Sequence, residues 1–174
     1  MTTKNKITKL TLSALVAALM ASGTASALTS PQSTTFDVSI TITNSCAITA
    51  TPIAFGNRLE VVTAWEATGT VTATCSAKAP ITVALSAGLG DGATFASRKM
   101  TDAVSTNTIN YTLRSASANG GVVYGDGSGG SSLVFASTST GAAQAFTING
   151  ITAASQTLKT AGTYNDTVTA TVMF

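Results

Sequence analysis

The sequence predicts an all-β protein whose strands form a sandwich of two sheets. Short runs of alternating apolar and polar residues recur along most of the chain. Glycine- and aspartate-rich turn signals separate these runs, and no amphipathic helical pattern follows residue 27. Thr and Val occupy many of the strand positions, in agreement with β-propensity. These observations favour one β-sandwich domain.

The first 27 residues are expected to form a signal peptide. Lys4, Lys6 and Lys9 precede an apolar stretch, residues 10–20, that is too short to span a bilayer. Ala25-Ser26-Ala27 then has the small-x-small pattern of a cleavage site. Cleavage after Ala27 would leave 174 − 27 = 147 residues, which suits one domain. The alternative is a buried N-terminal helix of the mature fold.

The first predicted strand covers residues 36–43, where apolar and polar residues alternate strictly. Further strands are predicted over residues 70–75, 81–85, 109–113, 146–148 and 164–174. Turns or loops are predicted over residues 89–92, 119–121 and 125–130.

The charge of the chain excludes two classes of partner. The whole sequence has 9 basic and 7 acidic residues, and removal of three signal-peptide lysines gives 6 − 7 = −1. A nearly neutral protein has no electrostatic footprint for nucleic acid or for an anionic membrane. Neither nucleic-acid binding nor membrane insertion is therefore expected. Charged residues make up only 9% of the chain, which suits a protein packed against copies of itself.

Two cysteines, Cys46 and Cys75, are expected to form a disulfide in an exported chain, and two buried free thiols are the alternative. The sequence has no histidine, so the usual general base is absent and neither a metal nor another cofactor is expected. An enzyme is not expected, although a hydrolase using two carboxylates, with Glu60 and Glu66 as the closest pair, stays an alternative. The glycine-rich loop at residues 125–130 lacks the Gly-Lys-Ser/Thr ending of a phosphate-binding loop.

The position of the first predicted strand leaves two interpretations open. Residues 36–43 precede the first cysteine, and the sequence stops at Phe174 within the last predicted strand. Residues 36–43 are either the first strand of their own domain or a strand offered to another molecule.

These features resemble the spore-coat-protein-U-like domain, found in pilins of archaic chaperone–usher systems. The resemblance covers residues 36–174. It is carried by Phe36-x-Val38-x-Ile40-x-Ile42 before Cys46, by Phe55-Gly56, by Val71-x-Ala73-x-Cys75, and by the ending Gly162-x-Tyr164-x-Asp166-x-Val168-x-Ala170-x-Val172-x-Phe174.

The resemblance implies an incomplete immunoglobulin-like β-sandwich that is completed by a donor strand from a neighbouring subunit. A periplasmic chaperone would first fill the open groove, and at the outer-membrane usher the next pilin's N-terminal strand would replace it. Fibres of such subunits would serve adhesion or biofilm formation at the cell surface.

The resemblance also implies residue roles. Residues 28–43 would be the N-terminal donor-strand extension and residues 44–174 the pilin domain, in which Cys46 and Cys75 join the first two core strands. The donor strand would use Phe36, Val38, Ile40 and Ile42. The groove edge that pairs with the chaperone and then with the neighbour would be Val168, Ala170, Val172 and Phe174.

Three alternatives remain: a self-complete secreted sandwich that binds a ligand, a spore or cell-surface coat protein, and a tip adhesin. A tip adhesin usually has an additional receptor-binding domain, for which we expect no room here.

Overall fold

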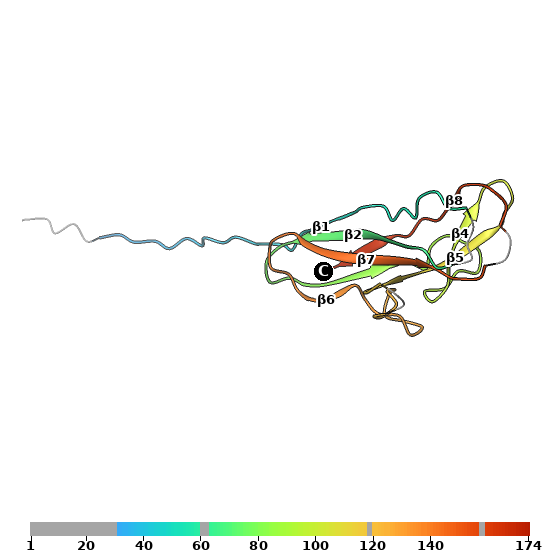
Figure 1. The fold of residues 1–174 in the computed structure, drawn as a ribbon. Helices are drawn as coiled ribbons and strands as arrows, with labels where there is room; N and C mark the ends of the chain where they lie inside the picture. The colour runs from blue at the N-terminus through green and yellow to red at the C-terminus, as the bar shows by residue number, and fades with distance from the viewer. Residues whose placement is uncertain (1–30, 60–62, 118–119, 157–158) are drawn as a thin grey trace, which may run out of the picture. The chain divides into compact units, whose positions relative to one another are not determined.

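The computed structural model describes residues 31–59, 63–117, 120–156 and 159–174. The expected signal peptide lies outside these residues. The chain divides into two parts after Ile40, and every strand in the described residues belongs to the second part. Figure 1 shows that this second part is a two-layer β-structure.

The strands form one sheet of six strands and one of three, and every pairing between them is antiparallel. The larger sheet has the order β1 (Cys46–Ala50), β2 (Glu66–Cys75), β7 (Gln144–Thr152), β5 (Thr108–Arg114), β4 (Arg98–Asp102) and β8 (Tyr164–Asn165). The smaller sheet has the order β6 (Phe135–Thr138), β3 (Pro80–Leu85) and β9 (Ala170–Met173).

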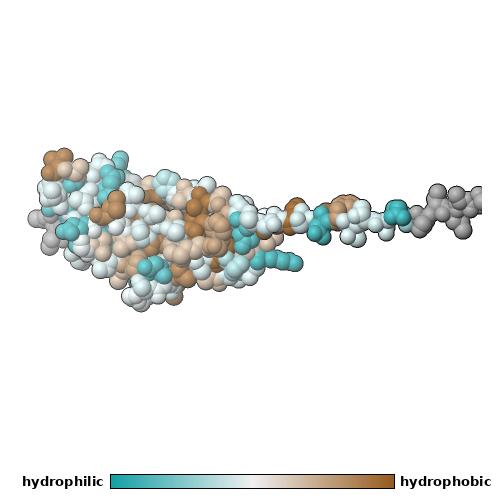
Figure 2. Space-filling model, turned by 180° about the vertical axis from the view of Figure 1, so that it is seen from behind, coloured by the Kyte–Doolittle hydropathy of each residue, from teal (hydrophilic) through white to brown (hydrophobic). Residues whose placement is uncertain are grey.

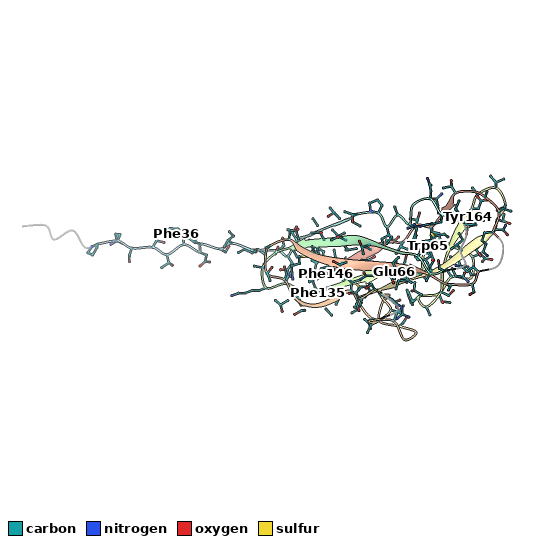
Figure 3. The ribbon with its side chains drawn as sticks, viewed as in Figure 1. Phe36, Trp65, Glu66, Phe135, Phe146 and Tyr164 are labelled. Carbon is teal, nitrogen blue, oxygen red and sulfur yellow. A yellow bond between two sulfur atoms is a disulfide. The ribbon has the colours of Figure 1, made fainter. Side chains whose placement is uncertain are left out.

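The core consists of apolar side chains from the inner faces of both sheets. The buried cluster comprises Val71, Ala73, Val83, Leu85, Tyr111, Leu113, Val134 and Ile148. Phe135 of the smaller sheet and Phe146 of the larger one close it on one side, with ring centroids 4.8 Å apart (Figure 3). The prediction of an all-β sandwich is confirmed. In the described residues there is no helix long and apolar enough to cross a membrane.

Four predicted strands are confirmed with small shifts of their ends. Residues 70–75 lie in β2, 81–85 in β3, 109–113 in β5 and 146–148 in β7. On β2 the inward face consists of Val71, Ala73 and Cys75, which are buried. No alternating run in the sequence predicted β1, β4 or β6.

The strand β4 has no apolar alternation because both of its ends carry a buried charged residue. Arg98 is fully buried and donates hydrogen bonds to the carbonyl oxygens of Ser86, Phe95 and Tyr124 at 2.8–3.1 Å. At the other end, Asp102 accepts hydrogen bonds from Ser105. A buried charge with its hydrogen bonds satisfied is tolerated in a strand, but no sequence pattern announces it.

The last predicted strand, residues 164–174, is corrected to two short strands that belong to different sheets. Residues 164–165 form β8 beside β4, whereas residues 170–173 form β9 beside β3. The chain therefore crosses from one layer to the other between them, which an uninterrupted alternation of side chains does not reveal. The structure places no strand at residues 36–43.

Most of the sandwich surface seen in Figure 2 is pale, because Thr, Ser, Gly and Ala have intermediate hydropathy, and strongly hydrophilic patches are few.

Candidate functional site

Two sheet edges lie next to each other and frame the candidate site. β1 ends the larger sheet and β9 ends the smaller one, and the two strands are neighbours. They meet most closely where Cys46 of β1 and Val172 of β9 pack against the same buried cluster of Cys75, Ala79 and Ile81. Away from that end the edges part, and the interior opens between them.

The opening is a groove of about 480 Å³ whose floor is the protein core. Five of the residues that line it are buried core residues, namely Val71, Leu85, Tyr111, Leu113 and Ile148. One wall comes from residues 50–53 and Phe55, and the other from residues 164–168 and Ala170. A groove that reaches the core beside an unpaired strand edge is the feature expected of a sandwich that lacks one strand.

The backbone of β9 offers free hydrogen-bonding positions to the groove side. Ser86 donates its amide hydrogen to the Thr169 carbonyl (2.9 Å), and the Thr169 amide donates to Ser86 Oγ (2.9 Å). Since β3 pairs Ala84 with Thr171, the odd-numbered residues of this segment turn their amides toward β3. The amides of Val168, Ala170 and Val172 therefore point to the open edge.

The structure distributes the four predicted groove-edge residues over different positions. Val168 and Ala170 line the groove and are half-buried against the core. Val172 is half-buried at the closed end, next to the cluster that contains Cys75. Phe174 lies past the end of β9 and is 57% exposed.

The sequence did not predict the wall that faces residues 164–170 as part of the site. Ile53 and Phe55 lie beyond β1 and point into the groove, where Phe55 meets the ring of Tyr111 edge-on at 6.4 Å. Glycines make room for them, because a Cβ on Gly150 would lie 2.8 Å from Ile53 Cγ2 and 3.1 Å from Phe55 Cζ. A Cβ on Gly69 would likewise lie 2.6 Å from Ile53 Cγ1. The alternation of Ile53 and Phe55 was the available signal.

A hydrogen-bonded pair of polar side chains lies in the floor and far wall of the groove. The Tyr111 hydroxyl donates to Asp166 Oδ2 at 2.6 Å, and the Leu89 amide donates to Asp166 Oδ1 at 2.8 Å. Burial raises the pKa of the Tyr111 phenol far above its usual value, and the bond to Asp166 adds to this rise. The carboxylate thus has protein partners, and an apolar cover over it would leave no oxygen unsatisfied.

The four residues predicted as donor-strand side chains are exposed. Phe36, Val38, Ile40 and Ile42 have 83–86% of their surface accessible. A row of large apolar side chains exposed in this way is unfavourable in water. We call residues 36–42 the donor segment below.

The predicted disulfide between Cys46 and Cys75 is present, with an S–S distance of 2.06 Å. These residues face each other directly in the register of β1 and β2. The bridge therefore fastens β1 to its neighbour at the residue where the chain enters the sandwich from the donor segment.

The described residues contain no cluster of three or more His, Cys, Asp or Glu side chains that could hold a metal ion. The groove is lined mainly by apolar side chains.

Comparison with known proteins identifies the family. The family model described as the Spore Coat Protein U domain matches residues 32–171. No curated protein matches the chain. A solved structure of similar fold is the CsuC–CsuE chaperone–tip adhesion subunit pre-assembly complex from archaic chaperone–usher Csu pili of Acinetobacter baumannii. The match has 24% identity and a TM-score of 0.53, and covers 77% of this chain but only 41% of the other. The family model spans most of the sequence, and the chain belongs to the Spore Coat Protein U domain family.

Proposed function

We propose that this chain is a structural, non-catalytic subunit of a surface pilus that polymerises by donor-strand exchange. The observation that carries the proposal is the groove of about 480 Å³, which opens the core beside an unpaired strand edge. The same chain carries an exposed segment with the pattern needed to fill such a groove. In this proposal residues 28–43 are the donor-strand extension and residues 44–174 the pilin domain.

The donor segment and the groove have complementary needs. A strand laid beside β9 would pair with the amides of Val168, Ala170 and Val172, which point to the open edge. Its alternating apolar side chains would cover the core, at about 1.5–3 kcal/mol for each fully buried side chain. Because donor and acceptor surfaces differ, the contact does not close on itself and generates a fibre.

The fibre geometry favours a donor strand that runs antiparallel to β9. The donor segment is joined to Cys46, which lies at the Val172 end of the groove. A neighbour's donor segment that entered from that same end would bring the neighbour's sandwich to the point where this subunit's own segment leaves. Entry from the Tyr164 end instead leaves each subunit's own segment free to reach the next groove.

We further propose three partners: a periplasmic chaperone, an outer-membrane usher, and copies of this chain or related pilins. The likeness to a chaperone–subunit pre-assembly complex and the family assignment support the chaperone. The chain would be exported through the periplasm and act at the cell surface, in adhesion or biofilm formation.

The experiment uses the exported full chain and compares Ile40→Asp with the matched control Thr41→Asp. Ile40 would point into a neighbour's groove, whereas Thr41 would point to solvent. We expect the parent and Thr41→Asp to form ladders that resist SDS and high-mass species in light scattering. Ile40→Asp should form neither, because an unpaired carboxylate would be buried in an apolar groove.

A self-complete sandwich predicts the opposite result. The parent would then be a stable monomer, and truncation of residues 28–43 would unfold it. Normal ladders from Ile40→Asp would also contradict the proposal.

A further inference from the structure

We infer the register of the donated strand: Phe36 lies opposite Ala170, Val38 opposite Val168, Ile40 opposite Asp166, and Ile42 opposite Tyr164 of the neighbouring copy. This inference rests on the proposed function and adds which residue occupies which position. It also makes Ala170 the residue that selects the largest donor side chain.

The inward faces of both strands restrict the possible registers. Val168, Ala170 and Val172 are half-buried against the core, whereas Thr169 and Thr171 are exposed. The apolar residues of the donor segment are also even-numbered. In an antiparallel pair, directly opposed residues share a face, so the permitted registers differ in steps of two residues.

The extent of the groove selects one of these registers. The edge residues that line it run from Tyr164 to Ala170, and in the inferred register the donor segment spans the same stretch. A shift by two residues in one direction would bring Phe36 to Val172, where β1 and β9 already pack on one cluster. A shift in the other direction would bring Ile42 to Gly162, which is not part of the groove lining.

Side-chain size supports the same register. Ala170 is smaller than Val168 and Val172, and it leaves space on the groove edge beside the core. Phe36 is the largest side chain of the donor segment. Close packing of an interface requires that large side chains meet small ones.

The position opposite Asp166 is compatible with an apolar donor side chain. Ile40 would cover Asp166, whose oxygens already accept hydrogen bonds from Tyr111, Leu89 and Thr167. Removal of water there would leave neither carboxylate oxygen without a hydrogen-bond donor.

The length of chain that connects two subunits gives an independent limit on the register. Ser45 belongs to the sandwich, since it accepts a hydrogen bond from the Ser76 amide at 2.8 Å. In the inferred register, Thr43 and Asn44 are free to connect Ile42 to Ser45, a span of about 10 Å at most. A shift toward Val172 would place Thr43 and Asn44 inside the groove and leave no free residue between two sandwiches.

Paired cysteines on the outward face test this register in the full chain. Asp37 would lie opposite Thr169, in a position that exchanges no backbone hydrogen bonds, where Cα atoms are about 4.5 Å apart. This separation suits a disulfide, whose Cα atoms are about 4.4–6.8 Å apart. From Asp37 to Thr171 the separation would be about 8 Å, which is too far. All three side chains are exposed, and Cys46 and Cys75 are already bonded to each other.

We expect the exported variant Asp37→Cys/Thr169→Cys to give a ladder that survives boiling in denaturant and collapses only with reductant. The matched variant Asp37→Cys/Thr171→Cys should give a ladder that boiling dissociates. Covalent ladders from the Thr171 variant alone would overturn the register and leave the proposed function intact. Boiling-sensitive ladders from both variants would also overturn it. Monomers from the parent chain would refute the proposed function and the register together.

A size exchange provides a second measurement. Ala170→Leu should shorten the ladders because Phe36 no longer fits, and Phe36→Ala in the same chain should restore them. Val168→Leu serves as the control, since Phe36→Ala should not restore growth there. Equal rescue of both variants would contradict the assignment of Ala170 to Phe36.

Discussion

At the residue scale, the three residues Gly162, Tyr164 and Asp166 of the C-terminal run make three different contacts. A Cβ on Gly162 would lie 2.6 Å from Asp102 Oδ1, so any larger residue would have to displace the Asp102 carboxylate. The Tyr164 hydroxyl donates to the carbonyl of Thr160 at 2.9 Å. Asp166 accepts from Tyr111 in the floor of the groove. Together these contacts hold the segment that crosses between the sheets.

The free energy of unfolding is expected to depend on pH because of Asp102. Its pKa lies below the usual 3.8. The main cause is the hydrogen bond that the Ser105 hydroxyl donates to the carboxylate, and the second is the hydrogen bond from the Ser105 amide. A carboxyl group whose folded pKa is lowered stabilises the fold fully above the unfolded pKa and loses this contribution as pH falls through the folded value. We expect the free energy of unfolding of the parent to fall below about pH 3.8.

Urea denaturation between acidic and neutral pH tests this expectation. Asp102→Asn should show a weaker decline below pH 3.8 than the parent, and Ser105→Ala should resemble it because the lowering donor is lost. An unchanged acid profile in both variants would contradict the assignment.

Gly150 makes room for one wall of the groove. Gly150→Val should displace Ile53 and Phe55, whose nearest atoms lie 2.8 and 3.1 Å from the added Cβ position. Overpacking of this kind costs about 1–3 kcal/mol in the free energy of unfolding. The control Thr147→Val is on the exposed face of the same strand and should change stability by less than about 0.5 kcal/mol. Equal effects of both variants, measured by thermal or urea unfolding, would exclude this role.

At the scale of elements, β1 depends on a covalent bond. It has five residues, lies at a sheet edge, and pairs only with β2 among the described strands. Its first residue, Cys46, is bonded to Cys75 at a sequence separation of 29. The disulfide therefore secures a short edge strand at its first residue.

Removal of this bridge should weaken the fold. For a loop of this length the chain-entropy model assigns about 3–4 kcal/mol to the bond. We expect Cys46→Ala/Cys75→Ala to lose about that much in urea denaturation, and the oxidised parent to lose a similar amount on addition of reductant. The variant itself should not respond to reductant. A variant as stable as the oxidised parent would show that β1 holds by pairing alone.

At the scale of the whole molecule, the sandwich lacks a cover along one side. The edge of β9 alternates between amides bonded to β3 and amides that face the opening. A completing strand would satisfy the second set and leave the first set unchanged.

Amide hydrogen exchange should detect this alternation. In the unpolymerised chain we expect the Val168, Ala170 and Val172 amides to exchange faster than Thr171, because Thr171 faces β3. In the fibre all of these amides should be slow. Protection of Val172 and Thr171 to the same extent before polymerisation would show that the edge is already covered. The Thr171 amide within the same strand is the internal control.

The sequence alone determined the class of the fold, the disulfide and the donor segment as a candidate. These features can be recognised from the sequence because they depend on local patterns, namely period-2 alternation, the number of cysteines and an amphipathic N-terminal run. Local patterns were insufficient for β4, where Arg98 is buried through hydrogen bonds to Ser86 and Tyr124 in other parts of the chain.

Only the tertiary structure decided where the groove lies and what forms its walls. Sequence periodicity tells which face of a strand is inward but not which sheet the strand joins, so residues 164–174 were expected as one strand instead of β8 and β9. Ile53 and Phe55 reach the groove because Gly69 and Gly150, on two other strands, leave them space. Such a wall depends on contacts between segments far apart in the chain, and these contacts exist only once the two sheets have packed.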